Sequence, residues 1–295
     1  MENETQQTKE KKYNLKNDVI FQTFFARKGN EEFLIDFLNA LLNKNIQKIE
    51  IREEVNLERL TREEKGGRLD LQAKLEDGTI VSIEMQIRDE GNFKERTTLY
   101  AGKVEARETK KGTDYEDISQ IIMINILGFN LLDVDDYISE TAIVLDKHRN
   151  YEVLDGIKWY FIELPKFRKT NPNMNEKINQ WLAFIDDNNK ELVDMAENKN
   201  ETLKKARIEM NHLAGDAEIR RLAELREKWE MDRISAINHA TKIGKEEGKK
   251  EGIEEGKKKE KLEIAIEMLK EKMPIDTIAK LTKLSKEEIE KIELN

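Results

Sequence analysis

Two acidic residues lie on neighbouring segments that both alternate between apolar and polar side chains. The first segment is residues 68–75 (Arg-Leu-Asp-Leu-Gln-Ala-Lys-Leu), and the second is residues 79–88 (Thr-Ile-Val-Ser-Ile-Glu-Met-Gln-Ile-Arg). This alternation is typical of β-strands, and the Asp77-Gly78 pair between the segments favours a hairpin turn. Asp70 and Glu84 would then lie on paired strands, where two carboxylates can hold a divalent cation.

The length of the hairpin loop decides which side chains meet. A two-residue turn would divide the polar residues between the two faces of the hairpin. A three-residue loop at 76–78, with its glycine in the left-handed conformation, places Asp70 opposite Glu84. On the same polar face we expect Gln72 opposite Gln86. Only this register collects the apolar residues on one face, namely Leu69, Leu71, Ala73, Leu75, Val81, Ile83, Met85 and Ile87.

Two like charges directly opposite each other destabilise a sheet by up to about 1 kcal/mol. A divalent cation reverses this effect, and Mg²⁺ prefers one or two carboxylates together with water and phosphate oxygens. In such a site the cation activates water and stabilises the charge that develops on phosphodiester cleavage. The alternative is a solvated face on which Arg68, Lys74 or Arg88 neutralises the acids. The alternation alone does not separate these two interpretations.

The composition narrows the chemistry that is available to the chain. Its 295 residues include no cysteine, which excludes disulfides, thiol nucleophiles and cysteine-ligated metals. The three histidines, at 148, 212 and 239, are far apart in sequence, which argues against a histidine-rich metal centre. A net charge of −9 argues against coating of nucleic acid by bulk charge but allows local basic patches. Because no apolar signal region or transmembrane run is present, we expect a cytoplasmic protein without membrane contact.

The hydrophobic pattern predicts an α/β domain at 13–169, after a polar and disordered N-terminus at 1–12. Apolar residues at spacings of three and four predict two helices from Phe21 to Leu41, broken near Gly29-Asn30. A further helix is expected at 92–110. Strand-like runs occupy 69–75, 80–87, 118–127, 141–145 and 157–164. These elements predict a mixed central sheet flanked by helices.

The remainder of the chain is expected to be almost wholly helical. A helical extension at 170–240 precedes a stretch at 241–261 that is rich in Gly, Lys and Glu. One glycine recurs every four residues there, at Gly244, Gly248, Gly252 and Gly256. The stretch is either a solvated linker or a helix whose glycine stripe allows close helix–helix contact, as in a homodimer. We favour the linker because apolar residues are nearly absent from this stretch.

The last segment, 262–295, predicts three short helices with tight turns, similar to a small helix-turn-helix unit. Ser285 followed by Glu288 is a capping box that begins the third helix. That helix is acidic, which is unfavourable for a recognition helix in the major groove. The alternative is a helical hairpin that packs on a neighbour or a partner.

Several motifs occur in an order that resembles a known family. These are residues 16–25 (KNDVIFQTFF), 67–70 (GRLD), 83–86 (IEMQ), Arg96 followed by Tyr100, and 160–164 (YFIEL). The Asp on one strand and Glu-x-Gln on the next resemble the core of PD-(D/E)XK nucleases, with Gln86 in place of the usual Lys and Leu69 in place of Pro. The whole series, with the late glycine stretch and short helices, resembles the Rpn family of recombination-promoting nucleases and transposase-like proteins. The resemblance is densest over 13–165.

This resemblance implies a metal-dependent DNA endonuclease with a PD-(D/E)XK-like fold. Asp70 and Glu84 would be the ligands of Mg²⁺ or Mn²⁺, and Gln86 would stand where the superfamily's Lys orients or activates the attacking water. Asp18, on the first helix, would be an accessory acid. A neutral amide supplies neither a general base nor a positive charge, but it can position water, and the Rpn family commonly has Gln at this position.

A basic stripe on the helix after the hairpin predicts a path for the substrate. Its members recur at spacings of three and four and so share one helix face: Arg96, Tyr100, Lys103, Arg107 and Lys110. Such a stripe could follow a phosphate backbone without reading bases. An ordinary solvated face is the alternative, because Glu95, Glu105 and Glu108 are interleaved with the basic residues.

Two classes of function therefore stay open from the sequence. The first is an endonuclease that cleaves DNA, in double-stranded form, with little sequence preference and serves recombination, transposition or defence against foreign DNA. The second is a non-catalytic DNA-binding or oligomeric scaffold on a nuclease-like fold. Cleavage of RNA is a third possibility, because the same metal chemistry supports it.

Overall fold

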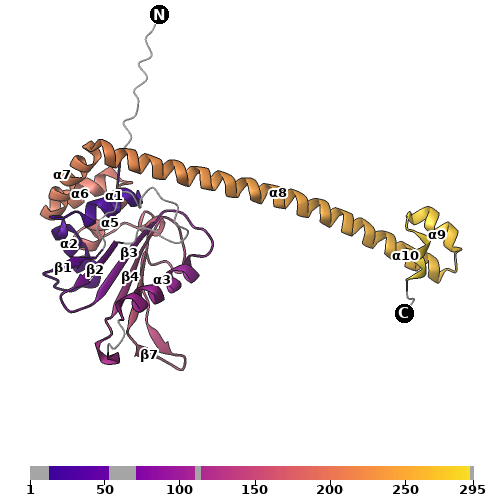
Figure 1. Cartoon of the computed structure of the whole chain (residues 1–295), viewed down its shortest axis with the longest axis horizontal. Helices are drawn as coiled ribbons and strands as arrows, with labels where there is room; N and C mark the ends of the chain where they lie inside the picture. Colours follow the sequence, from indigo (N-terminus) through magenta and orange to yellow (C-terminus); the bar gives the residue numbers. More distant parts are fainter. Residues whose placement is uncertain (1–12, 53–70, 110–113, 293–295) are drawn as a thin grey trace, which may run out of the picture. The chain divides into compact units, whose positions relative to one another are not determined.

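A computed structural model gives the structure of the chain and describes residues 13–52, 71–109 and 114–292. The chain divides into two compact units, residues 1–228 and residues 229–295. The first unit contains a sheet covered by helices, and the described part of the second is wholly helical (Figure 1). Among the described residues, no helix is both long enough and apolar enough to cross a membrane.

The described strands of the first unit form a six-stranded mixed sheet in the order β1-β2-β3-β4-β8-β5. The strands β1, β2 and β3 pair antiparallel, β3, β4 and β8 pair parallel, and β5 is antiparallel to β8. Their bounds are β1 Ile49–Ile51, β2 Leu71–Leu75, β3 Ile80–Gln86, β4 Ile121–Leu127, β5 Ile138–Glu140 and β8 Ile157–Glu163. Two further strands, β6 (Ile143–Leu145) and β7 (His148–Leu154), form a separate hairpin. The predicted α/β class with a mixed sheet is confirmed.

The β2–β3 hairpin has the three-residue loop that the sequence predicts. Gly78 has a φ of +89°, the Leu75 amide donates to the Thr79 carbonyl (2.9 Å), and Leu71 pairs with Ile83. One expectation was wrong: Gln72 lies opposite Ser82 and not opposite Gln86, because each step back along β2 is one step forward along β3. Asp70 lies outside the described residues, so its pairing with Glu84 stays a prediction.

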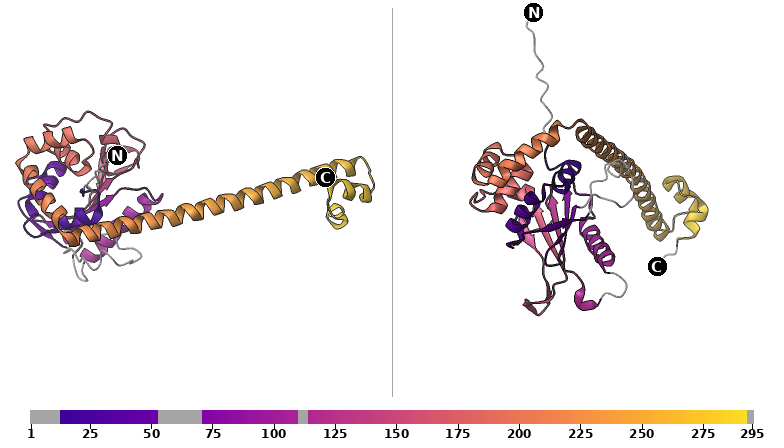
Figure 2. Two further views of the ribbon diagram at one scale, coloured as in Figure 1. Left: turned by 90° about the horizontal axis from the view of Figure 1, so that it is seen from above. Right: turned by 60° about the vertical axis from the view of Figure 1, so that its left-hand side comes forward.

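One face of the sheet packs against a layer of helices and forms the main core (Figure 2, right). The bounds of these helices are α1 Asp18–Ala26, α2 Glu31–Leu42, α4 Leu164–Phe167, α5 Lys177–Asp186, α6 Lys190–Lys199 and α7 Glu201–Gly215. Apolar residues of the hairpin, among them Leu71, Val81 and Ile83, belong to this core. The fully buried Trp181 lies among aromatic rings, 6.0 Å from Phe25 between centroids.

Local signals set the ends of the first two helices. The Asn17 side chain accepts hydrogen bonds from the amides of Val19 and Ile20 and so caps α1. The predicted break lies at Gly29, whose φ of +97° favours glycine, and α2 ends at Asn43 in the left-handed conformation.

The opposite face of the sheet is covered by a single long helix, α3 (Phe93–Glu108), within the described residues (Figure 2). Its buried residues are Phe93, Thr97, Ala101 and Val104, which follow a spacing of three and four. The helix connects the parallel strands β3 and β4, as a crossover helix does in α/β proteins. A short 3₁₀ turn (η2, Tyr115–Asp117) precedes β4.

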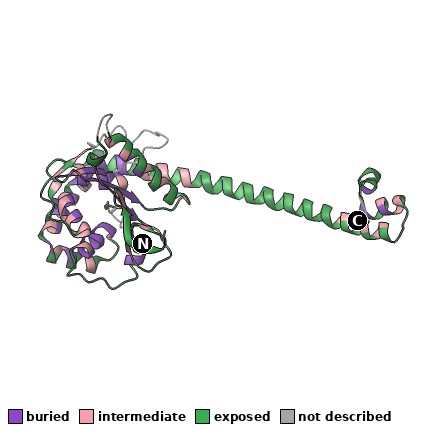
Figure 3. Ribbon diagram, turned by 90° about the horizontal axis from the view of Figure 1, so that it is seen from below, coloured by how far each residue is buried: buried purple, intermediate pink, exposed green. Residues whose placement is uncertain are grey.

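The helix α8 (Ala217–Lys270) begins in the first unit and ends in the second, where α9 (Ile275–Thr282) and α10 (Lys286–Glu290) follow. The glycine-containing stretch 241–261 is helical and exposed on all sides (Figure 3). Ala265, Ile278, Leu284 and Ile289 form a small core of the second unit. The predicted capping box of Ser285 and Glu288 is present.

A partly buried carboxylate links α2 to α5 and to the beginning of α7. Asp36 accepts hydrogen bonds from Lys177 (2.9 Å), Trp181 (3.0 Å) and Asn200 (3.2 Å). Burial by itself would raise the pKa of Asp36, but these donors outweigh it and hold the pKa below its ordinary value. A carboxyl group with a depressed pKa stabilises the fold above its unfolded-state pKa, and this stabilisation is lost as the pH falls through the folded-state pKa.

We therefore expect Asp36→Asn to destabilise the protein at pH 7 and to have a smaller effect at about pH 3, because the stabilisation from the lowered pKa of Asp36 begins to be lost once the pH falls below the ordinary carboxyl pKa of 3.8. Urea unfolding of both proteins at the two pH values measures this difference. A gap in unfolding free energy that widens on acidification would contradict the assignment.

Gly128 follows β4 and packs against the chain that leaves β3. Its amide donates to the Gln86 carbonyl (2.8 Å), and an added Cβ would lie 2.5 Å from the Ile87 carbonyl oxygen. Because backbone cannot yield as a flexible side chain can, we expect Gly128→Ala to destabilise the protein by about 1–3 kcal/mol. The matched control is Gly156→Ala, whose added Cβ meets nothing within 4 Å, with an expected effect within about 0.5 kcal/mol. Equal urea midpoints for the two variants would contradict this prediction.

Candidate active site

Glu84 lies on β3 and faces α3. Its residue exposure is only 3%, and the parallel pairing of β3 with β4 places it beside Asn125. A carboxylate this deeply buried needs compensation, because an ionised group loses several kcal/mol of solvation on burial. The compensation comes from Arg96 on α3, whose Nη2 lies 3.0 Å from Glu84 Oε1.

Arg96 contacts a second carboxylate as well. Its Nη1 donates to Glu90 Oε2 at 3.0 Å, and its guanidinium carbon lies 5.0 Å from the centre of the Phe93 ring. Glu90 belongs to the loop between β3 and α3. One guanidinium therefore joins carboxylates from a strand and from a loop.

A buried polar contact fixes α3 next to this ion pair. Thr97, the neighbour of Arg96, contacts Asn125 on β4 with 3.1 Å between their side-chain oxygens. Asn125 is fully buried and also donates to the Tyr160 carbonyl on β8 (3.2 Å). The helix is thus held across three strands at the level of Glu84.

Gln86 lies two residues after Glu84 on the same face of β3. It is 4% exposed, and its Nε2 donates to the carbonyl of Arg88 (2.7 Å). An amide group offers both donors and an acceptor oxygen. Glu84 and Gln86 share one face of β3, as the alternation predicts, and the structure shows that α3 covers this face.

The polar face of the hairpin is largely buried, with Lys74 partly exposed, and is not a solvated surface. Gln72 is 4% exposed and accepts a hydrogen bond from Arg107 of α3, while the Ser82 hydroxyl, 1% exposed, has no hydrogen-bond partner among the described residues. Arg68, one of the cations expected to neutralise this face, lies outside the described residues. Arg96, which comes from α3 and was not among the cations expected to do so, pairs with Glu84.

The residues of the proposed basic stripe on α3 differ in whether they contact the sheet. Arg96 and Arg107 reach the sheet through Glu84 and Gln72, whereas Lys103 is exposed and lies 5.5 Å from the centre of the Tyr100 ring. Lys110 lies outside the described residues. Arg107 and Lys103 remain exposed residues, so the outer part of the stripe is accessible to a polyanion.

Asp18 occupies the first turn of α1, a helix that contacts β2 and β3. Its Oδ1 accepts from the Val19 amide (3.0 Å), and its Oδ2 accepts from Arg226 Nε on α8 (2.7 Å). Its described contacts therefore join α1 to α8 and include no residue of the Glu84 cluster.

Sequence reasoning missed Glu90, Asn125 and Ser82. Asn125 had a usable signal, because a single amide inside the apolar run Ile121–Leu127 must find buried hydrogen-bond partners. Glu90 had none, since it is one of many acids in a polar loop. Glu90 can be recognised as a site residue only from the tertiary structure, in which α3 packs over β3 and Arg96 contacts both Glu84 and Glu90.

The donor set at this cluster suits a hard divalent cation. Glu84 and Glu90 supply carboxylate oxygens, Gln86 an amide oxygen, and the unpartnered Ser82 hydroxyl lies on the same face of β3, two residues from Glu84. Among the described residues, no three His, Asp or Glu side chains are grouped closely enough to hold a metal ion by themselves. A carboxylate from the undescribed segment, as Asp70 is expected to supply, would complete such a set.

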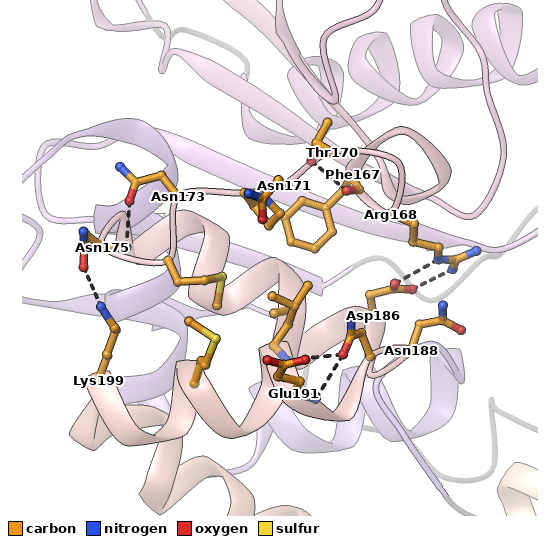
Figure 4. Close-up of a pocket in the computed structure, with 16 residues that line it drawn as sticks. Phe167, Arg168, Thr170, Asn171, Asn173, Asn175, Asp186, Asn188, Glu191 and Lys199 are labelled. Atoms are coloured by element: carbon orange, nitrogen blue, oxygen red, sulfur yellow. Dashed lines mark hydrogen bonds and ion pairs between the residues drawn. The ribbon is translucent and has the colours of Figure 1, made fainter.

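A separate hollow of about 640 Å³ lies beside α5 and α6 and the loop that precedes them (Figure 4). Its one deeply buried acid, Asp186, accepts two hydrogen bonds from Arg168 at 2.9 and 2.6 Å. Hydrogen bonding to Asp186 raises the pKa of Arg168 above its ordinary value. The buried charge in this hollow is therefore compensated internally, and the hollow contains none of the predicted site residues.

Comparison with known families agrees with this fold. Residues 15–240 match the PD-(D/E)XK nuclease family transposases. Because this match spans most of the chain, the protein belongs to that nuclease family. Residues 258–293 match the C-terminal HTH domain of the Rpn/YhgA-like nuclease family, which identifies the chain as an Rpn-type member. None of the curated proteins and none of the solved structures matches it.

Proposed function

We propose that this protein is a metal-dependent endonuclease that hydrolyses phosphodiester bonds of double-stranded DNA with little sequence preference. The main support for this proposal is the burial of the Glu84 carboxylate on β3, where it pairs with Arg96. The chain that contains this buried carboxylate belongs to the nuclease family. A buried acid on a central strand of such a protein is a functional-site candidate with a physical rationale.

Within this proposal Glu84 and Asp70 hold Mg²⁺ or Mn²⁺, and Gln86 orients the attacking water. The cation, when bound, lowers the pKa of water and stabilises the developing phosphorane charge. Gln86 positions a water by hydrogen bonding without taking its proton. Asp18 is assigned an accessory acidic role, although its described side-chain partner is Arg226 of α8.

The DNA backbone follows α3, where Lys103, Arg107 and Lys110 provide positive charge, Tyr100 provides an aromatic face, and Arg96 lies at the reacting end. Contacts of this kind neutralise phosphates and carry no sequence information. The family match to an HTH domain supports a second DNA contact in the C-terminal unit. We assign the activity to DNA recombination, transposition or defence in the cytoplasm, carried out by a homodimer that forms through the C-terminal helices.

The test is nicking of supercoiled plasmid by the purified chain with Mg²⁺, with Mn²⁺ and with EDTA, and with a structured RNA in the same reaction. We expect metal-dependent conversion of plasmid to open-circular and linear forms, and loss of this activity in Asp70→Ala. Cleavage by Asp70→Ala at the wild-type rate would show that the active site is assigned wrongly. If the protein cleaves the RNA and not the plasmid, the substrate is RNA and the proposal of DNA as substrate is wrong.

A non-catalytic DNA-binding or scaffold protein is the second candidate. Two observations favour it: Arg96 already pairs with Glu84, and Gln86 stands in place of the usual Lys. This candidate predicts no cleavage with either metal, together with salt-sensitive DNA binding that survives Glu84→Ala.

A further inference from the structure

Arg96 binds two carboxylates at once in a nearly closed environment. Its Nη2 is 3.0 Å from Glu84 Oε1 and its Nη1 is 3.0 Å from Glu90 Oε2, and the three side chains are 13%, 3% and 19% exposed. The two acids belong to different elements, Glu84 to β3 and Glu90 to the loop that follows it. The guanidinium thus occupies the position that bridges both carboxylates.

A guanidinium and a divalent cation satisfy the same oxygens by different means. Arginine donates hydrogen bonds to carboxylates from a planar fork, whereas Mg²⁺ and Mn²⁺ bind the oxygens directly. Both neutralise buried negative charge, which must be compensated in either state. Because the two cations repel each other and need the same atoms, they cannot both be fully engaged with Glu84 and Glu90.

We propose that Arg96 is an internal substitute for the divalent cation, that Glu90 is a further carboxylate of the cation site, and that cation loading displaces Arg96 from both acids. This inference rests on the proposed function, because it takes Glu84 as a cation ligand. The displaced guanidinium is then available to a substrate phosphate, so cation loading prepares the site for the anionic substrate.

The surroundings of Arg96 allow this exchange without movement of the helix. Phe93 and Thr97 on either side are 1% and 2% exposed and anchor α3 to the sheet. The Arg96 side chain has four rotatable bonds and can turn while its Cα stays in place. Glu90 lies next to Gly91, whose φ of +77° marks a tight turn in the loop.

The first test is titration of the DNA-free, full-length protein with Mn²⁺ by calorimetry. We expect Arg96→Gln to lower the dissociation constant for Mn²⁺ at least fivefold and Glu90→Gln to raise it at least fivefold. The matched control is Lys94→Gln, which removes one exposed positive charge two residues away on α3 and should leave the constant unchanged. An Arg96→Gln variant that binds Mn²⁺ as wild type does, or more weakly, would overturn the inference.

A second measurement on the wild-type protein covers the case in which Arg96→Gln does not fold. The Nε–Hε NMR signal of Arg96, assigned by its absence from Arg96→Lys, is followed during titration with Mg²⁺. We expect this signal to shift to a new position at saturation, with the signals of Arg149 and Arg27 unmoved. An unmoved Arg96 signal at saturating Mg²⁺ would contradict displacement.

Glu84→Gln distinguishes failure of this inference from failure of the proposed function. If Glu84→Gln binds Mn²⁺ as tightly as wild type, the proposed metal site is wrong. If Glu84→Gln loses binding while Arg96→Gln leaves it unchanged, only the displacement of Arg96 is wrong.

Discussion

Replacing Glu84 by Gln is expected to lower Mg²⁺-dependent DNA cleavage by at least about 10³-fold, which corresponds to about 4 kcal/mol of transition-state stabilisation. The amide keeps the size of the side chain and can still accept a hydrogen bond from Arg96, but it lacks the negative charge that a divalent cation needs. The rate of supercoiled plasmid loss under single-turnover conditions measures the effect.

The matched control is Glu95→Gln, which removes an exposed acid from the first turn of α3, next to Arg96 in sequence. It changes the net charge by the same amount and should leave the cleavage rate within about twofold, as expected for an exposed surface charge. Urea unfolding of both variants verifies that they fold. If folded Glu84→Gln cleaves DNA at more than a tenth of the wild-type rate, the assignment of Glu84 to the catalytic centre is wrong.

The largest expected loss of stability comes from Glu163→Ala at the end of β8. Glu163 is fully buried, accepts from the Leu131 and Leu132 amides, and pairs with Lys166 at 2.6 Å. Its removal leaves the Lys166 ammonium, whose side chain is 10% exposed, without its carboxylate. Breaking a buried pair from one side costs about 3–5 kcal/mol, and two backbone donors lose their acceptor in addition.

Urea unfolding at pH 7 measures this loss, with Asp146→Ala as the control. Asp146 pairs with Arg149, but both side chains are highly exposed, at 87% and 74%. Ion pairs of this kind contribute little because water and salt screen them, so the control should leave the urea midpoint unchanged. Similar midpoints for the two variants would show that the Glu163–Lys166 pair is replaceable.

The hairpin shows how much a local pattern can determine. Alternation along both segments and the Asp77-Gly78 turn were sufficient to predict the loop, the register and the apolar face. A register shift by one residue would turn every apolar side chain away from the core, and the sequence therefore allows only one pairing. The same register places Gln72 opposite Ser82, so the expected opposition of Gln72 and Gln86 was wrong.

The helical region shows where a local pattern was insufficient. The glycines at 241–261 lower helix propensity by about 1 kcal/mol each, which favoured a linker, yet the stretch is helical. Lys and Glu between the glycines are good helix formers. The segments before and after the stretch are helical as well, so that all three form the single helix α8. Propensity alone did not predict that outcome.

The sequence by itself determined that the chemistry of this protein depends on carboxylates, since it contains no cysteine and three scattered histidines. It also determined that Glu84 and Gln86 share the polar face of β3. Only the tertiary structure decided what covers that face. The packing of Phe93, Thr97 and their neighbours on three strands sets the rotation of α3, and that rotation aims Arg96 at Glu84 and Glu90. Contacts between residues that are distant in sequence depend on this packing, which no local pattern encodes.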